Sequence, residues 1–170
     1  CISRFGTVDP TSGGESHRYS LSVDAWSQGD DGRGWSANVY AMDYYLELIS
    51  NFSYAIDQVN GDQFEQYDDR RVYGGRYEHA WPASFTDRPG ALRAGVELRR
   101  DEIEPVGLFL TTQAQRRATV RQDDVKQTSA SAYLAHDQRW NDWLRTEFGV
   151  RLDHFDFDVA SNVAANSGTA

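Results

Sequence analysis

The densest group of possible metal ligands in the 170-residue chain is the run DHFDFD at 153–158. Carboxylates and an imidazole form a donor set that divalent metals accept. The run also continues an alternating strand pattern, and in a strand Asp153 points to the face opposite His154, Asp156 and Asp158. We therefore predict no metal site here and interpret the run as a strand that passes into a loop.

A second acidic group, in the segment 51–69, offers oxygen ligands of the kind that Ca²⁺ prefers. The spacing of a twelve-residue calcium loop is absent, so we expect these carboxylates to be solvated loop charges. They are Asp57, Asp62, Glu65, Asp68 and Asp69.

Three arginines form the one basic cluster of the segment 102–124: Arg116, Arg117 and Arg121. A guanidinium fork matches a carboxylate or a phosphate. These arginines are our candidates for ligand-facing loop residues, with an anionic metal chelate or a lipid phosphate as the partner. The alternative is a strand extension that faces solvent.

Residues that could act as nucleophiles do not assemble a catalytic group in the sequence. The serines lie in alternating strand segments and the four histidines are scattered, so no nucleophile–base pair can be placed. The glycine pairs at 13–14 and 74–75 have no phosphate-loop context. We predict that the protein is not an enzyme and has no cofactor.

The elements that must position these residues repeat with a period of two. In the segment 92–99, for example, Leu92, Ala94, Val96 and Leu98 alternate with polar residues and glycine. Such alternation predicts antiparallel strands with one apolar and one polar face. Six strands are predicted, at 17–28, 35–50, 70–85, 91–101, 125–137 and 142–159.

Within the second predicted strand the apolar phase slips, from Ala41 to Tyr44. A bulge would produce this slip, as would the exit of the strand from an apolar layer.

The connections between the predicted strands are unequal in a regular way. Those at 28–34, 86–90 and 137–141 are short and rich in turn residues, whereas those at 51–69 and 102–124 are long. Short turns at one end of a sheet and long loops at the other are typical of outer-membrane barrels.

Aromatic residues gather near both predicted ends of the sheet. The five tryptophans, at positions 26, 35, 81, 140 and 143, lie near the short links. Near the long links lie Tyr44, Tyr45, Phe52, Tyr54, Tyr73, Phe155 and Phe157. Indoles and phenols prefer a membrane–water boundary, so the pattern predicts two aromatic girdles.

Composition limits the remaining classes of protein. The net charge of -9 and the pI near 4.8 argue against nucleic acid as a partner. No run approaches the roughly 20 apolar residues of a membrane-spanning helix. A soluble lipocalin-like barrel is the main alternative, but a single lysine and apolar rows rich in Ala and Thr favour a membrane barrel.

Three segments resemble TonB-dependent outer-membrane receptors. SNFSYAIDQVNGDQFEQYDDRRVYGG, at 50–75, is similar to a strand–loop–strand segment of that family. RFGTVDPTSGGESHRYSLS resembles the entry into a barrel strand, and LRTEFGVRLDHFDFDVAS resembles a recurrent G-x-R-x-D strand.

This resemblance implies an all-β antiparallel meander, about six strands of a larger transmembrane β-barrel in the bacterial outer membrane. Residues 1–170 would then be an incomplete barrel domain without a plug. The implied function is active uptake of a scarce nutrient such as an iron–siderophore or cobalamin. The implied partners are outer-membrane lipid, the plug domain of the same protein, TonB and the small-molecule ligand, with no nucleic acid.

Two alternatives remain open from the sequence. The first is a segment of a passive porin-like barrel. The second is a soluble β-barrel binding module anchored by a lipid on Cys1. We expect instead that Cys1 begins an internal segment, because no flexible polar tether follows it.

Overall fold

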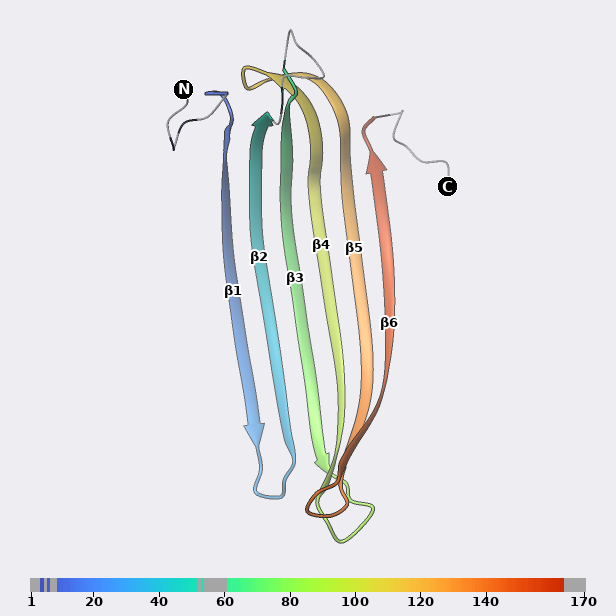
Figure 1. Ribbon diagram of the computed structural model, residues 1–170. Helices are drawn as coiled ribbons and strands as arrows, with labels where there is room; N and C mark the ends of the chain where they lie inside the picture. The colour runs from blue at the N-terminus through green and yellow to red at the C-terminus, as the bar shows by residue number, and fades with distance from the viewer. Residues whose placement is uncertain (1–3, 5, 7–8, 52, 54–60, 164–170) are drawn as a thin grey trace.

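The computed structural model describes residues 4, 6, 9–51, 53 and 61–163. Within them six antiparallel strands form one sheet in the order β1-β2-β3-β4-β5-β6 (Figure 1). The strands are β1 (Gly13–Gln28), β2 (Gly34–Asn51), β3 (Gln63–Pro82), β4 (Gly90–Thr112), β5 (Gln115–Arg139) and β6 (Arg145–Ser161). The predicted all-β meander is confirmed.

Three short turns join the strands at the lower end of Figure 1, and local hydrogen bonds stabilise the first and the third. Between β1 and β2, Gly32 takes a φ of 79°, which favours glycine, and the Asp31 carboxylate accepts from the Arg33 amide at 3.0 Å. Between β5 and β6, the side-chain oxygen of Asn141 accepts from the amides of Trp143 and Leu144 at 3.0 and 2.8 Å. These turns keep neighbouring strands in tight antiparallel register.

The prediction of a long loop at 102–124 is wrong. β4 runs on to Thr112, and Gln113 and Ala114 alone turn the chain into β5, with φ values of 51° and 62°. Register shifts interrupt the pairing between Ile103 and Val106, so the apolar alternation changes phase there. That phase change hid a continuing strand, and Figure 1 shows the long hairpin bending across the upper end of the sheet.

The predicted loop at 51–69 is shorter than expected for a related reason. β3 already begins at Gln63, so Asp68 and Asp69 lie in a strand. Residues 52 and 54–60 lie outside the described part of the chain.

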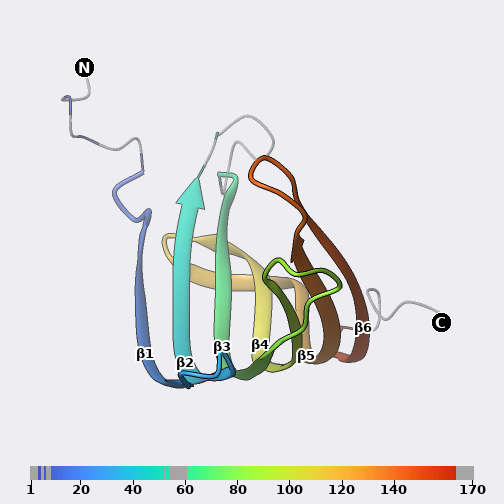
Figure 2. The ribbon, with the colours of Figure 1, turned by 90° about the horizontal axis from the view of Figure 1, so that it is seen from below.

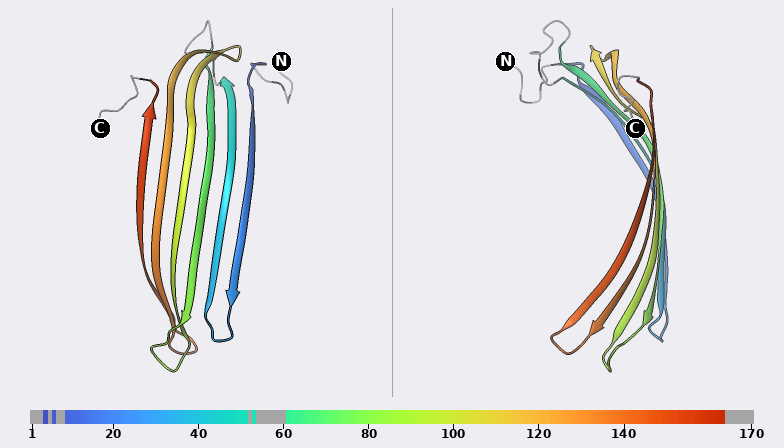
Figure 3. Two further views of the ribbon diagram at one scale, coloured as in Figure 1. Left: turned by 180° about the vertical axis from the view of Figure 1, so that it is seen from behind. Right: turned by 90° about the vertical axis from the view of Figure 1, so that its right-hand side faces the viewer.

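The sheet is a single curved layer, as Figures 2 and 3 show. The accessible surface of the chain is 12000 Å², whereas a compact monomer of this mass has about 8,400 Å². Among the described hydrophobic residues, Val72 and Phe109 are buried. A second layer that would bury either face is absent from the described residues.

The two faces differ in chemistry, and the strand register defines them. Leu21, Val39 and Val96 share the outer face, and Ser22, Asn38 and Glu97 the inner face. Side-chain contacts that skip a strand occur on the inner face between β4 and β6, where Arg93 pairs with Glu147. Because side chains converge on the concave side of a curved sheet, we assign the inner face to that side at the height of Arg93; near the upper end, the Arg116–Glu65 pair skips β4 on the outer face.

Two tyrosines of the inner face lie flat across glycines of the neighbouring strand. A Cβ atom added to Gly74 would lie 2.3 Å from the Tyr40 ring, and one added to Gly95 would lie 2.3 Å from the Tyr133 ring. Each glycine is the register partner of its tyrosine. The rings therefore cover backbone that any larger side chain would displace.

We expect Gly95→Leu to lower the free energy of unfolding by about 1–3 kcal/mol, because the new side chain forces the Tyr133 ring off β4. Equilibrium urea unfolding in detergent micelles, followed by tryptophan fluorescence, measures the change. The control is Gly149→Ala, whose Cβ would meet its nearest atoms at 3.4 and 3.5 Å. Equal stabilities of the two variants would contradict the packing argument.

Candidate functional site

The most extensive candidate site is a band of apolar side chains on the outer face. Its large members on β1, β4 and β6 are highly exposed: Leu21 is 70% exposed, Leu98 60% and Leu152 73%. The band also includes Gly75, His79 and His136. We define the apolar band by the outer-face residues at positions 19–25, 35–41, 73–81, 92–98, 130–136 and 148–152. Toward the upper end of the sheet an ionisable outer-face residue follows it directly on five strands, and on β5 Thr128 stands between the band and Lys126.

The upper boundary of the band runs obliquely across the strand register. On the outer face the first ionisable residues above it are His17, Asp43, Arg71, Arg100, Lys126 and His154. The register carries His154 across the sheet to Val23, which lies six residues below His17 (23 − 17). Six residues are about 20 Å of strand, and five strand spacings are about 24 Å, so the slope is about 40°.

This slope is the angle at which strands cross a membrane barrel, about 35–45°. On β3 the band runs from Tyr73 to Trp81, about 27 Å along the strand and about 21 Å along an axis tilted by 40°. Outer-membrane barrels carry an apolar band about 25 Å tall. The band thus has the tilt and nearly the height that a bilayer requires.

Aromatic residues mark the lower boundary of the band, as predicted. Trp35 and Trp81 lie on the outer face near the short turns, and Trp140 and Trp143 lie in the turn between β5 and β6. The Trp140 indole donates to the Thr146 hydroxyl at 2.8 Å. Trp26 also lies near this end, but the register with Ser36 places it on the inner face.

The predicted upper girdle is wrong in part. Tyr45 and Tyr73 lie on the outer face, but Tyr44, Phe155 and Phe157 lie on the inner face, since neighbouring positions of a strand alternate. Phe52 and Tyr54 lie outside the described residues.

A row of three rings on β1, β2 and β3 borders the band at its upper side, and of these Tyr45 alone belongs to the predicted girdle. The His17 ring stacks on Tyr45, with centroids 5.1 Å apart, and Tyr45 meets the edge of Tyr67 at 5.4 Å. The Tyr45 hydroxyl donates to Glu47 at 2.9 Å, and this hydrogen bond is the main cause that raises the pKa of Tyr45. The phenol therefore keeps its proton and remains a donor.

Behind the apolar band, ion pairs cross the inner face. Arg93 pairs with Glu147, and Arg151 bridges Glu97 at 3.3 Å and Asp153 at 2.8 Å. Charged groups thus turn away from the apolar side at the same height on the strands. This arrangement is typical of a wall between lipid and a wet interior.

The three candidate arginines lie in β5 and not in a loop. Arg116 is held on the outer face: it pairs with the buried Glu65, and its guanidinium lies 3.9 Å from the centroid of the Phe109 ring. Arg121 lies on the inner face and pairs with Asp123. Arg117 falls at a register shift between them. The structure therefore splits the predicted cluster, and Arg121 is its member on the inner face.

The acidic groups form no metal centre in the described residues. His154, Asp156 and Asp158 share the outer face and Asp153 lies on the inner face, as predicted. No group of three or more His, Cys, Asp or Glu residues could hold a metal ion in the part of the chain that is described. Of the acidic segment, Asp57 lies outside the described residues.

A hydrogen-bond network joins the segments that meet at the upper end. The carboxylate of Asp9 accepts from Asn51 and from Gln63, each at 2.8 Å, and from the Thr11 amide and hydroxyl at 2.9 and 2.6 Å. Gln63 in turn accepts from the Ala114 amide at 2.8 Å. The hydrogen bond from the Thr11 side chain, followed by that from Asn51, lowers the pKa of Asp9 to about 2.

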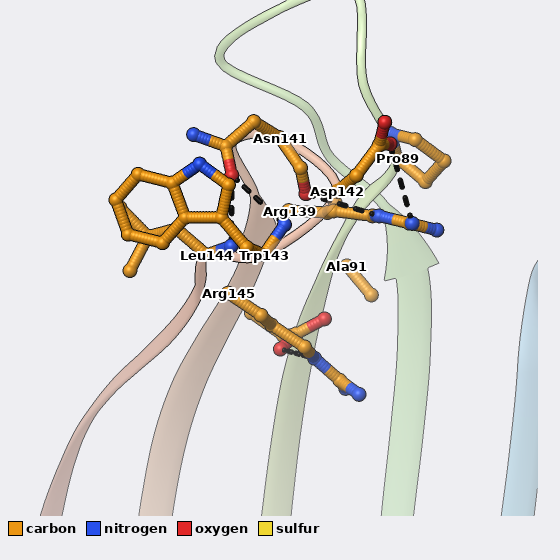
Figure 4. A pocket seen from close by; sticks show the side chains of 10 residues that line it. Pro89, Ala91, Arg139, Asn141, Asp142, Trp143, Leu144 and Arg145 are labelled. Carbon is orange, nitrogen blue, oxygen red and sulfur yellow. Dashed lines mark hydrogen bonds and ion pairs between the residues drawn. The ribbon is translucent and has the colours of Figure 1, made fainter.

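A hollow of about 520 Å³ lies among the short turns at the lower end (Figure 4). Its charged groups are paired within the protein: Arg88 and Arg139 with Asp142, at 3.0 and 3.5 Å, and Arg145 with Asp137. Because these charged groups already pair with one another, few of them remain to bind a ligand in the hollow.

Comparison with known proteins adds no relative: no family model, curated protein or solved structure matches the chain. In the described part of the chain, no helix has the length and apolar character needed to cross a membrane.

The hydrogen bonds of Asp9 make the free energy of unfolding depend on pH. Because its folded pKa, about 2, lies below the ordinary value of 3.8, Asp9 contributes stability above about pH 4, and this contribution is lost as the pH falls through the folded pKa. We expect Asp9→Asn to lower the free energy of unfolding by about 1–2 kcal/mol near neutral pH, and the difference from the wild type to shrink toward pH 2. Urea unfolding midpoints measured across this range provide the test. A constant difference would contradict it.

Proposed function

We propose that the chain is a barrel segment of a TonB-dependent outer-membrane receptor, which takes up a scarce nutrient such as an iron–siderophore or cobalamin. The oblique apolar band on the outer face carries the proposal. The resemblance of the segments 50–75, 4–22 and 144–161 to this family supplies the choice among membrane barrels.

Exposure of the apolar band to water is unfavourable. Large apolar side chains such as Leu21, Val150 and Leu152 are 61–73% exposed, and removing such a side chain from water contributes about 1–2 kcal/mol. A bilayer covers all of them at once without requiring a second protein layer. Lipid is therefore the partner that best fits the outer face.

The edges of the sheet support a barrel larger than six strands. Among the described strands, β1 pairs only with β2, and β6 only with β5. Backbone groups on an open edge have no partner in hydrocarbon, where each unsatisfied group costs several kcal/mol. Further strands that pair with β1 and β6 would satisfy them and would close the wall around the inner face.

The charged inner face fits the proposed interior. Arg93, Glu97 and Arg151 hold their partners within the sheet, yet Arg151 and Glu97 remain 47% and 43% exposed. Such groups can bind water, a plug domain or a passing polar solute. In this account the segment supplies the wall, and the plug and TonB supply the gating.

The lipid-facing band predicts opposite outcomes for two neighbouring residues of β1. We expect Leu21→Arg to cost about 2–4 kcal/mol, because it places a charge in the apolar band, and to reduce the amount of folded protein in the outer-membrane fraction. Ser20→Arg, on the inner face, should leave that amount unchanged. The measurement is quantitative blotting after membrane fractionation. Equal tolerance of both variants, or recovery of the parent protein in the soluble periplasmic fraction, would contradict a membrane location.

Active uptake separates the receptor from a passive porin. In whole cells, we expect accumulation of the radiolabelled nutrient to require both the complete protein and TonB. Deletion of TonB should abolish accumulation and leave binding at the cell surface intact. Uptake that continues at the same rate without TonB would identify a diffusion barrel.

A further inference from the structure

The two faces exchange their chemistry above the apolar band. On β2 the inner face becomes apolar, with Met42, Leu46 and Leu48, while Asp43 and Glu47 occupy the outer face. The registers with β1 and β3 continue through this segment without a shift. The phase slip seen in the sequence is therefore a true exchange of faces and not a bulge.

The inner face also gains apolar residues on β4, β5 and β6, whereas β3 carries Gln66, Asp68 and Arg70 there. On the inner face of β4 lie Val106, Leu108 and Leu110, and on that of β5 and β6 lie Val125 and Val159. Above the band the inner face thus carries apolar residues on β2, β4, β5 and β6 beside the polar residues of β3 and the Arg121–Asp123 pair, although the outer surface is charged. In the proposed barrel this region stands above the lipid, where acyl chains cannot cover it.

This part of the inner face contains a hollow of about 470 Å³. Its volume lies within the range of about 300–1,000 Å³ that is usual for small-molecule sites. Side chains of Leu46, Val106, Leu108 and Val125 form an apolar floor, and all four are half-buried. The polar lining comes from Gln66, Asp68, Arg121 and Asp123.

Asp123 has one carboxylate oxygen that its neighbours do not use. The residue is 2% exposed, and its Oδ2 accepts from the Arg121 Nε atom. Its Oδ1 is buried and has no hydrogen-bond partner among the described residues. The hydroxyl of Ser161, its register partner on β6, lies close enough to help lower the pKa of Asp123, but it directs its hydrogen bond to the Val163 carbonyl at 3.3 Å. A buried acceptor without a hydrogen bond lowers the stability of the fold, and a donor group of a bound ligand would remove this cost.

The charges around Asp123 fix the kind of donor. The hydrogen bond from Arg121 is the main cause that lowers the pKa of Asp123, so the group is an ionised carboxylate and can only accept. The nearby Asp68 is already engaged by both Nε and Nη2 of Arg70. Asp123 is therefore the residue of the lining that keeps an unpaired acceptor oxygen among the described residues.

Arg121 complements this acceptor. Its side chain is 62% exposed, and of its donors the Nε group is engaged, by Asp123. The other N–H groups of the planar fork remain for an oxygen of a ligand. The Arg121–Asp123 pair thus offers a donor and an acceptor side by side above an apolar floor.

We propose that this hollow binds a small amphipathic molecule that places an apolar ring or chain on Leu46 and Leu108 and donates a hydroxyl hydrogen bond to Asp123. An oxygen of the same molecule accepts from Arg121. The inference rests on the proposed function, since it assigns ligand capture to the inner wall of the barrel above the membrane.

A pair of fluorescent probes tests the hydroxyl requirement in the complete protein, reconstituted in bilayers. Umbelliferone carries a hydroxyl donor, and its O-methyl ether has the same ring without the donor. At mildly acidic pH, where the hydroxyl keeps its proton, we expect umbelliferone to bind about tenfold more tightly, the value of one buried hydrogen bond. Equal affinities of the two probes would overturn the proposal.

Two neighbouring variants locate that preference. Asp123→Asn should abolish the preference, because the amide places a donor where the carboxylate has an acceptor. Asp124→Asn is the control. Asp124 is the next residue of β5, and its carboxylate accepts from the Asn162 side-chain amide at 3.5 Å. An undiminished preference in Asp123→Asn would show that the probe binds elsewhere.

A labelling measurement does not depend on how well Asp123→Asn folds. With Cys1 replaced by serine, Leu46→Cys in the floor should react with a maleimide and be protected by umbelliferone. Leu48→Cys, outside the hollow, should react equally with and without the probe. A cysteine at position 46 that never reacts would show that another part of the protein covers the hollow, which would overturn the proposal.

Failure of this inference and failure of the membrane assignment can be told apart. If the wild-type protein binds the two probes equally but Leu21→Arg still reduces the folded protein in the outer-membrane fraction, only the ligand site is contradicted. A soluble parent protein that still prefers umbelliferone would remove the receptor and keep the hollow.

Discussion

Backbone hydrogen bonding is the constraint on which the rest of the structure depends. Each strand satisfies its N–H and C=O groups only through its neighbours, and the sheet has no second layer among its described residues. In lipid these groups cannot turn to water, so long, continuously paired strands are required. Strands of 16 to 25 residues, with register shifts near Asp68 and in the upper β4–β5 hairpin, meet that requirement.

Once pairing is fixed, each side chain is committed to one face, and chemistry divides along the strands. In the lower half the outer face is apolar and the inner face carries Arg93, Glu97 and Arg151. In the upper half Leu46, Leu108 and Val125 lie on the inner face, while β3 keeps polar residues there. One continuous sheet can thus meet lipid on its outside at one height and a ligand on its inside at another.

The sequence predicts the part of this arrangement that repeats. Period-two alternation gives six strands, the meander and the apolar rows, because each follows from local spacing. It does not give the length of β4 and β5, since the register shift after Ile103 breaks the alternation and imitates a loop. It also cannot pair Asp9 with Gln63, or leave Asp123 with an open oxygen, because these contacts join positions far apart in the chain.

The central claim is that the outer face meets lipid along a tilted band. Single cysteines on β1 and β6, labelled with a fluorophore in bilayers that contain brominated lipids, measure it most directly. We predict strong quenching at alternate positions only. The centre of quenching should lie between Leu21 and Val23 on β1 and at Val150 on β6. A band perpendicular to the strands would instead have its β1 centre at Ser27, the residue that the register places in the same row as Val150. Quenching that is absent, that is equal on both faces, or whose centre follows the register would contradict the account.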